Sequence, residues 1–201
     1  MSGPGDVTVR GWMDRGTKLF LDALGDLPDD ALGEPTGLPG WSRRHLVAHV
    51  HYNAEALRRL VSWARTGVEN RMYADADQRA REIEAGAELP AERLRALVRA
   101  SAAELSDDLD SLPAEAWLHE VVTAQGRTVP ATEIPWMRTR EVAVHAVDLR
   151  AGVTFGDLPE ELNAALAAAV VKKRAASGEA SSLAGWLTGR VPQAPALGPW
   201  L

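Results

Sequence analysis

Glu141 and His145 are the residues whose types and spacing most directly suggest chemistry. They are four positions apart in the stretch WMRTREVAVHAVDL, residues 136–149. When this stretch is helical, positions i and i+4 lie on one helix face, so the carboxylate and the imidazole can reach the same point. Both groups bind Zn²⁺ and similar divalent ions in proteins. The spacing therefore predicts one half of a metal site.

A second histidine-rich stretch, residues 41–53, could supply the remaining ligand. In a helix His49 shares a face with Leu46 and Val50, so it is expected to point inward and is the predicted third ligand. His45 and His49 are also four apart, and this pair is the rival assignment. Two histidines and one carboxylate are a donor set of catalytic zinc sites, which leave a fourth position for water or another ligand.

Each of these residues can also be explained as a structural residue that binds no metal. Glu/His pairs at this spacing are common on solvated helices, and His45, His51 and His119 are favoured as surface residues or hydrogen-bonded core residues. The helix around Glu141 is mostly apolar, however, and a buried carboxylate without a partner is costly. Asp148 could support a ligand or could be a charge at a helix end, and spacing leaves both open.

Composition limits the chemistry further. The chain has 201 residues, no cysteine and a net charge of −6. It therefore cannot make a disulfide or a thiolate metal site, and a sulfur nucleophile would have to come from a bound small thiol. The acidic balance disfavours nucleic acid. Without a secretory pattern or a long apolar run, we expect a cytoplasmic protein without membrane association.

Helical periodicity dominates the chain and predicts the elements that position these residues. The first four expected helices, residues 7–24, 42–67, 75–85 and 91–109, suggest an antiparallel bundle. Residues 117–130 are expected to be extended or to form a small hairpin. The helix carrying Glu141 and His145 should end at Gly152, and residues 158–177 and 181–189 are expected to form two more helices.

Several of these stretches, residues 40–50, 123–130, 136–149 and 154–159, closely resemble mycothiol-dependent maleylpyruvate isomerases. The resemblance implies a mainly α protein with a DinB-like four-helix bundle and zinc, or another divalent metal, held by His49, Glu141 and His145. It predicts a metal- and thiol-binding bundle over residues 1–152. It also predicts a shortened C-terminal domain over residues 153–201, either α/β or a helical appendage.

The resemblance also implies an activity. Maleylpyruvate would be converted to fumarylpyruvate, a step of gentisate degradation, with mycothiol as cofactor: a zinc-bound thiolate adds, the resulting single bond rotates and the thiol is eliminated. Arg79 and Arg190 would orient the carboxylates of this small substrate and stabilise the developing enolate. The alternatives are a zinc-dependent mycothiol S-transferase and a non-catalytic metal-dependent binding domain. A monomer or small homo-oligomer is expected.

Overall fold

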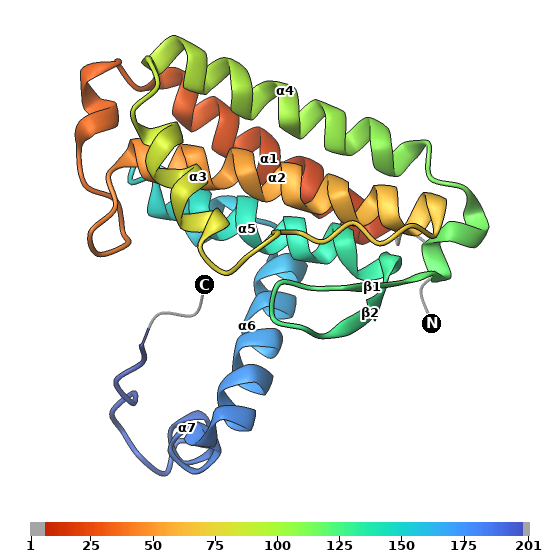
Figure 1. Cartoon of the computed structure of the whole chain (residues 1–201). Helices are drawn as coiled ribbons and strands as arrows, with labels where there is room; N and C mark the ends of the chain where they lie inside the picture. Colours follow the sequence, from red (N-terminus) through yellow and green to blue (C-terminus); the bar gives the residue numbers. More distant parts are fainter. Residues whose placement is uncertain (1–6, 199–201) are drawn as a thin grey trace. The chain divides into compact units, whose positions relative to one another are not determined.

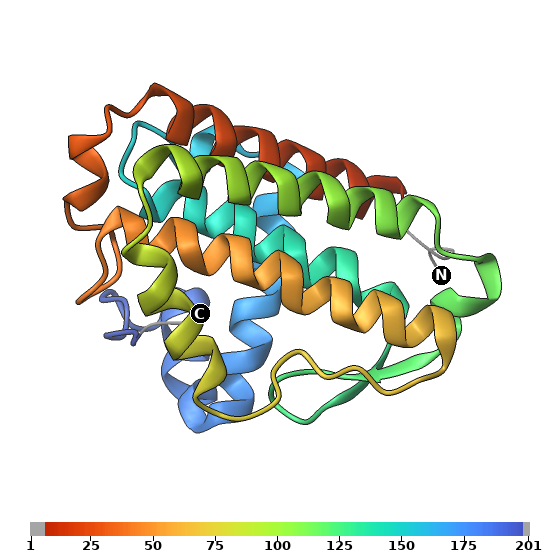
Figure 2. The ribbon, with the colours of Figure 1, turned by 45° about the horizontal axis from the view of Figure 1, so that its top comes forward.

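The computed structural model describes residues 7–198, and its first compact unit ends at Thr154. Long helices lie side by side in this unit (Figures 1 and 2). Their bounds are Val7–Asp26 for α1, Arg43–Thr66 for α2, Ala91–Asp110 for α4 and Ile134–Asp148 for α5. Helix α1 packs on α5 and α4, and α2 packs on the same two helices, which closes a four-helix bundle.

Helix α2 shows how the sequence produces these elements. Its start is capped by His45, whose Nδ1 accepts a hydrogen bond from the backbone N–H of Ser42 at 3.3 Å. Its end is marked by Gly67, which has a φ of 72° and donates its N–H to the carbonyl of Trp63. The left-handed conformation favours glycine at this position. Between these ends, residues such as Leu46 and Leu60 are fully buried, each worth roughly 1.5–3 kcal/mol.

The directions of the helices differ from the expected antiparallel bundle. Gly16 of α1 packs against Ala143 of α5, and Val9 lies near Thr139, so α1 and α5 run in the same direction. Helices α2 and α4 are also parallel, because His51 pairs with Ser101 and Arg58 with Asp108 further along both helices. The two parallel pairs oppose each other, as the contact between His49 and Glu141 and that between Arg43 and Leu149 show.

Helix α3, Gln78–Ala87, is therefore not a member of the bundle, and the expectation that the first four helical segments form it is wrong. It packs on α2, where Gly86 lies close to Ala48 and Tyr52. Since α4 runs parallel to α2, the chain must return to the start of α2 first. It does so through residues 67–90, and Arg44 binds the carbonyl of Leu89 at the end of that path. This return carries α3 across α2.

The predicted hairpin is confirmed. Strands β1, Glu120–Val122, and β2, Thr128–Pro130, pair antiparallel with Val121 opposite Val129. Both valines are buried and join the core at one end of the bundle. The hairpin leads directly into α5, so it anchors the start of the helix that carries Glu141 and His145.

The second compact unit begins at Phe155. It contains α6, Glu160–Arg174, a π-helical turn and α7, Ala180–Leu187, and its buried residues include Leu162, Leu166 and Leu183. Among its described residues, 155–198, there is no strand, so the helical form of the expected appendage is the one present. Within residues 7–198, no helix combines the length and apolar character needed to cross a bilayer.

Candidate metal centre

The predicted ligands lie together. Nε2 of His49 is 2.9 Å from Oε2 of Glu141, and Nε2 of His145 is 3.3 Å from the same oxygen. The two imidazole centroids are 5.0 Å apart, and the rings are nearly perpendicular. One donor atom from each residue can be chosen so that all lie within 4.8 Å of one another. Helix α2 contributes His49, and α5 contributes the other two from adjacent turns.

His145 is oriented by a carboxylate. Its Nδ1 lies 2.8 Å from Oδ2 of Asp148, one turn later on α5. A carboxylate can only accept, so Nδ1 carries a proton, and in the neutral ring Nε2 is the atom that keeps the lone pair, on the side of Glu141 and His49. Sequence spacing left the role of Asp148 open, and the structure makes it the partner of a predicted ligand. Such partners fix the ring and the tautomer of metal-binding histidines.

A glycine makes room for this carboxylate. The N–H of Gly37 donates to the backbone carbonyl of Asp148 at 2.8 Å, which holds the loop before α2 against the end of α5. A Cβ on Gly37 would lie only 2.9 Å from Oδ1 of Asp148. Any larger residue would push on the carboxylate that orients His145. Position 37 therefore belongs to the support of the site, a role that the sequence did not indicate.

His49 has different surroundings. Its ring lies beside the indole of Trp41, with centroids 5.4 Å apart. Nη2 of Arg79 is 3.4 Å from Nδ1 of His49, and the guanidinium lies over the indole at 5.7 Å from its centroid. Because α3 crosses α2, it brings Arg79, one of the two arginines predicted to contact the substrate, to the side of the cluster. Trp41 was not expected at the site from the sequence.

Burial and charge act together on the titratable groups. Burial is the largest influence on His49 and lowers its pKa. Burial also opposes charging of His145, but its hydrogen bond to Asp148 and the negative charge of nearby Glu141 outweigh this and raise its pKa. For Glu141 burial alone would raise the pKa, yet the two imidazoles hold it well below the usual 4.5. Glu141 is therefore an anion at neutral pH, as a metal ligand must be.

The donor set fits a divalent metal. Within residues 7–198, Nε2 of His145 is buried and has no hydrogen-bond partner of adequate geometry, although it faces Glu141. A buried polar atom without a partner requires an explanation, and an ion is one of them. Tetrahedral ligands about 2.0–2.2 Å from a shared ion lie about 3.3–3.6 Å apart. The 3.3 Å between His145 and Glu141 falls in this range, and the 2.9 Å between His49 and Glu141 is shorter. That His49, Glu141 and His145 bind a metal remains a prediction.

The other predicted residues lie elsewhere. His45 contacts Ser42 and Glu84, so the rival pair of His45 and His49 does not converge on one point. His51 and His119 make hydrogen bonds away from the cluster, to Ser101 and to the carbonyl of Ala64. Arg190 lies in the second unit, exposed, and donates to the carbonyl of Thr188. Its predicted role therefore remains a prediction.

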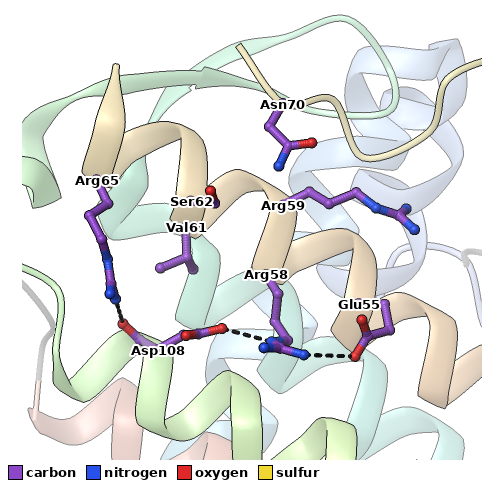
Figure 3. A pocket seen from close by; sticks show the side chains of 8 residues that line it. All are labelled: Glu55, Arg58, Arg59, Val61, Ser62, Arg65, Asn70 and Asp108. Atoms are coloured by element: carbon purple, nitrogen blue, oxygen red, sulfur yellow. Dashed lines mark hydrogen bonds and ion pairs between the residues drawn. The ribbon is translucent and has the colours of Figure 1, made fainter. Parts of the chain in front are cut away.

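A separate open cavity of about 370 Å³ lies along α2 (Figure 3). Its charged lining residues include Glu55, Arg58, Arg65 and Asp108. Arg58 reaches both Glu55 and Asp108, while Arg65 binds the backbone carbonyl of Asp108. These charges neutralise one another, and the predicted metal ligands are not among the residues that line the cavity.

The fold and the cluster define a class of protein: a DinB-like helical bundle with a His, Glu and His donor set on facing helices. Comparison with known proteins then identifies the family. Residues 13–150 match the family described as the mycothiol maleylpyruvate isomerase N-terminal domain. The chain belongs to this family of enzymes, as the resemblance in its sequence predicted.

Solved structures agree with this assignment. The crystal structure of a mycothiol-dependent maleylpyruvate isomerase is 44% identical, covers 85% of this chain and 72% of its own, and superposes with a TM-score of 0.80. A structure of its histidine-to-alanine mutant is 43% identical, with the same coverage and TM-score. No curated protein matches the chain at a significant level.

Proposed function

We propose that this protein is a mycothiol-dependent isomerase that converts maleylpyruvate to fumarylpyruvate with the help of a divalent metal ion, for which zinc is the proposed identity. The observation that carries the proposal is the convergence of His49, Glu141 and His145 in a chain of this family. Catalytic zinc sites with two histidines and one glutamate leave a position for an exogenous ligand. The place of the reaction in gentisate degradation is part of the same proposal.

The metal would supply a Lewis acid that stabilises the thiolate form of a bound thiol near neutral pH. The thiol would supply reversible addition to the activated double bond, which permits rotation and returns the thiol unchanged. The protein's own groups prepare the site for this. Asp148 holds the proton of His145 on Nδ1, Glu141 carries the negative charge, and both imidazoles present Nε2 to the same point.

The thiol must come from outside the chain, because the sequence contains no cysteine. This requirement separates the proposed reaction from hydrolysis by a metal-bound hydroxide, which needs no thiol. It also supports mycothiol as a cofactor, since thiol dependence is named for the similar crystal structure.

Arg79 is the proposed partner of a substrate carboxylate. A neutral imidazole that coordinates through Nε2 carries its proton on Nδ1, so His49 then offers Arg79 no acceptor. The guanidinium already lies beside the ligand cluster, against Trp41. It can therefore pair with a carboxylate there and stabilise the enolate charge. Arg190 is proposed as a second such cation, on the resemblance alone.

The direct test is incubation of the purified, zinc-loaded protein with mycothiol and maleylpyruvate, followed by absorbance and by NMR identification of the product. Fumarylpyruvate should form only when thiol is present, and glutathione should support the reaction less well than mycothiol. Chelator-treated protein and His49→Ala should be inactive. Full turnover in thiol-free buffer would rule out the proposed mechanism.

Two outcomes would select the alternatives. Conjugation of other electrophiles to mycothiol without isomerisation of maleylpyruvate would establish an S-transferase. Metal binding with neither reaction would support a binding domain. Arg79→Ala and Arg190→Ala test the arginines: each should retain zinc, and each should lower kcat/KM if it contacts the substrate in the transition state.

A further inference from the structure

Arg138 is a buried cation that the proposed mechanism does not use. Its side chain is fully enclosed, with 1% of the residue exposed. Nη1 donates to the backbone carbonyl of Val50 at 2.7 Å and to Oδ1 of Asn53 at 2.8 Å. In the part of the chain that the structure describes, its Nη2 has no hydrogen-bond partner. Burial lowers the pKa of Arg138 to about 10, so it remains charged at neutral pH.

A buried charge whose bonded partners are both neutral is costly, and such groups are usually paired or ligated. An apolar residue of similar size would fill this position between α2 and α5 at lower cost. The position of the contact suggests what the arginine does. Val50 and Asn53 follow the predicted ligand His49 on α2, and Arg138 precedes Glu141 by one turn of α5.

The position of α5 along α2 decides whether the three ligands meet. Helix α2 supplies His49 alone, whereas Glu141 and His145 share α5, so movement of α5 along α2 changes only the distances to His49. Apolar side chains of the shared core, which includes Leu46 of α2 and Ala146 of α5, tolerate sliding better than hydrogen bonds do. A pair of bonds below 3 Å restricts that movement. Ligand groups must be held within about 0.5 Å of the productive geometry.

We propose that Arg138 is a positioning residue for the metal centre: it holds α5 on α2 one turn from the ligands and so determines the affinity and coordination geometry of the site without contacting the ion. The inference rests on the metal site of the proposed function. It extends that proposal to a residue outside the ligand set and its hydrogen-bonded partners.

The positive charge of Arg138 provides a way to separate positioning from electrostatics. Arg138 interacts electrostatically with Glu141. Its charge therefore opposes the binding of a cation at the same carboxylate. Removal of Arg138 should tighten metal binding if charge is its main influence, and should weaken it if positioning is. The two roles therefore predict changes of opposite sign in the metal affinity of an Arg138 variant.

The experiment compares zinc affinity, by competition with a chromogenic chelator, and the visible spectrum of the Co²⁺-loaded protein. The variants are Arg138→Met, Asn53→Ala and Asn53→Asp. Loss of a group hydrogen-bonded to a metal ligand typically lowers affinity about 10–100-fold. Arg138 does not bond a ligand itself, so we expect the lower end of this range, about tenfold, for Arg138→Met. The Co²⁺ bands of Arg138→Met should shift and weaken as the coordination geometry loosens.

Asn53→Ala removes one acceptor and should lower affinity by a smaller factor, and it also guards against failure of Arg138→Met to fold. Asn53→Asp supplies a carboxylate oxygen at the same place, so its affinity should stay within about twofold of wild type. Two further variants serve as controls. Arg58→Met breaks bonds between α2 and α4, and Leu105→Ala destabilises the core. Both should retain wild-type affinity and spectrum.

The proposal is overturned if Arg138→Met lowers the unfolding temperature as Leu105→Ala does while its zinc affinity and Co²⁺ spectrum remain those of wild type. It is also overturned if Arg138→Met binds zinc more tightly, or if Asn53→Asp loses as much affinity as Asn53→Ala. Failure of the wild type itself to bind a divalent metal would instead contradict the proposed function.

Discussion

Helix α2 carries two charged clusters of opposite character. On the side facing α4, Arg58 lies within ion-pair distance of Glu55, Glu104 and Asp108, and all of these side chains are about one third to one half exposed. On the side facing α5, His49 meets Glu141 and His145, whose side chains are 5%, 16% and 2% exposed. In the first cluster each charged side chain has an oppositely charged neighbour and contacts water, whereas the second leaves a buried ring nitrogen without a hydrogen-bond partner among the described residues.

This difference separates structural charge from a candidate site. Exposed ion pairs need no further ligand and contribute little, typically about 0–1 kcal/mol. Buried donors that converge on one point and remain unsatisfied need a further partner. The size of a cavity does not distinguish the two, because the open cavity of Figure 3 lies beside the exposed, ion-paired cluster. Burial and unmet coordination do distinguish them.

The largest effect is expected from His49 of α2. His49→Ala should abolish tight zinc binding, because a histidine and a glutamate alone do not make a three-ligand site. His51→Ala is the matched control, since His51 is also buried but bonds to Ser101. It should lose stability and keep its metal, as measured by metal analysis after dialysis and by chelator competition. Equal metal loss in both variants would show that His49 is not a ligand distinct from the structural histidine His51.

The support of His145 should have the next largest effect. Asp148→Asn leaves an amide that can donate to Nδ1, which permits the wrong tautomer, and should weaken zinc binding about 10–100-fold. Gly37→Ala should weaken binding by a smaller factor, since its Cβ would displace the same carboxylate. Isothermal titration calorimetry measures both. Gly33→Ala is the control, because nothing lies within 4 Å of a Cβ there.

The pH dependence of the stability of the metal-free protein should show that His145 is charged beside Asp148 and Glu141. The pKa of His145 is raised above 6.5 in the folded state, because its hydrogen bond to Asp148 and the negative charge of nearby Glu141 outweigh its burial. The stabilisation is therefore complete below pH 6.5 and is lost as the pH rises through the raised pKa. The free energy of unfolding, measured in urea on chelator-treated protein, should differ more between wild type and His145→Gln at about pH 6 than at about pH 9. A constant difference would contradict the assignment.

The smallest effect is expected from the exposed cluster. Glu104→Gln or Asp108→Asn should change the free energy of unfolding by less than about 1 kcal/mol and should leave zinc affinity unchanged. Addition of about 0.5 M NaCl should reduce this difference further, because salt screens exposed pairs. A change in metal affinity in either variant would show that the two clusters of α2 are coupled.

Much of the site could be predicted from the sequence, because ligand spacing within a helix is a local property. Glu141 and His145 face the same way whenever residues 136–149 are helical. Helix periodicity predicted that His49 points inward, and the match to family motifs selected the same three ligands. The helical class and the hairpin also followed from local periodicity and turn residues. These inferences need only the geometry of one element at a time.

The tertiary structure decided what depends on residues distant in the sequence. Periodicity does not encode helix direction, so only packing revealed that α2 and α4 are parallel and that the return between them places Arg79 against His49. The roles of Gly37 and Arg138 likewise arise from contacts between segments far apart in the chain. The sequence by itself determined which groups could bind a metal. The packing of α5 against α2 determined that they meet, because hydrogen bonds and close contacts across that interface exist only in the folded chain.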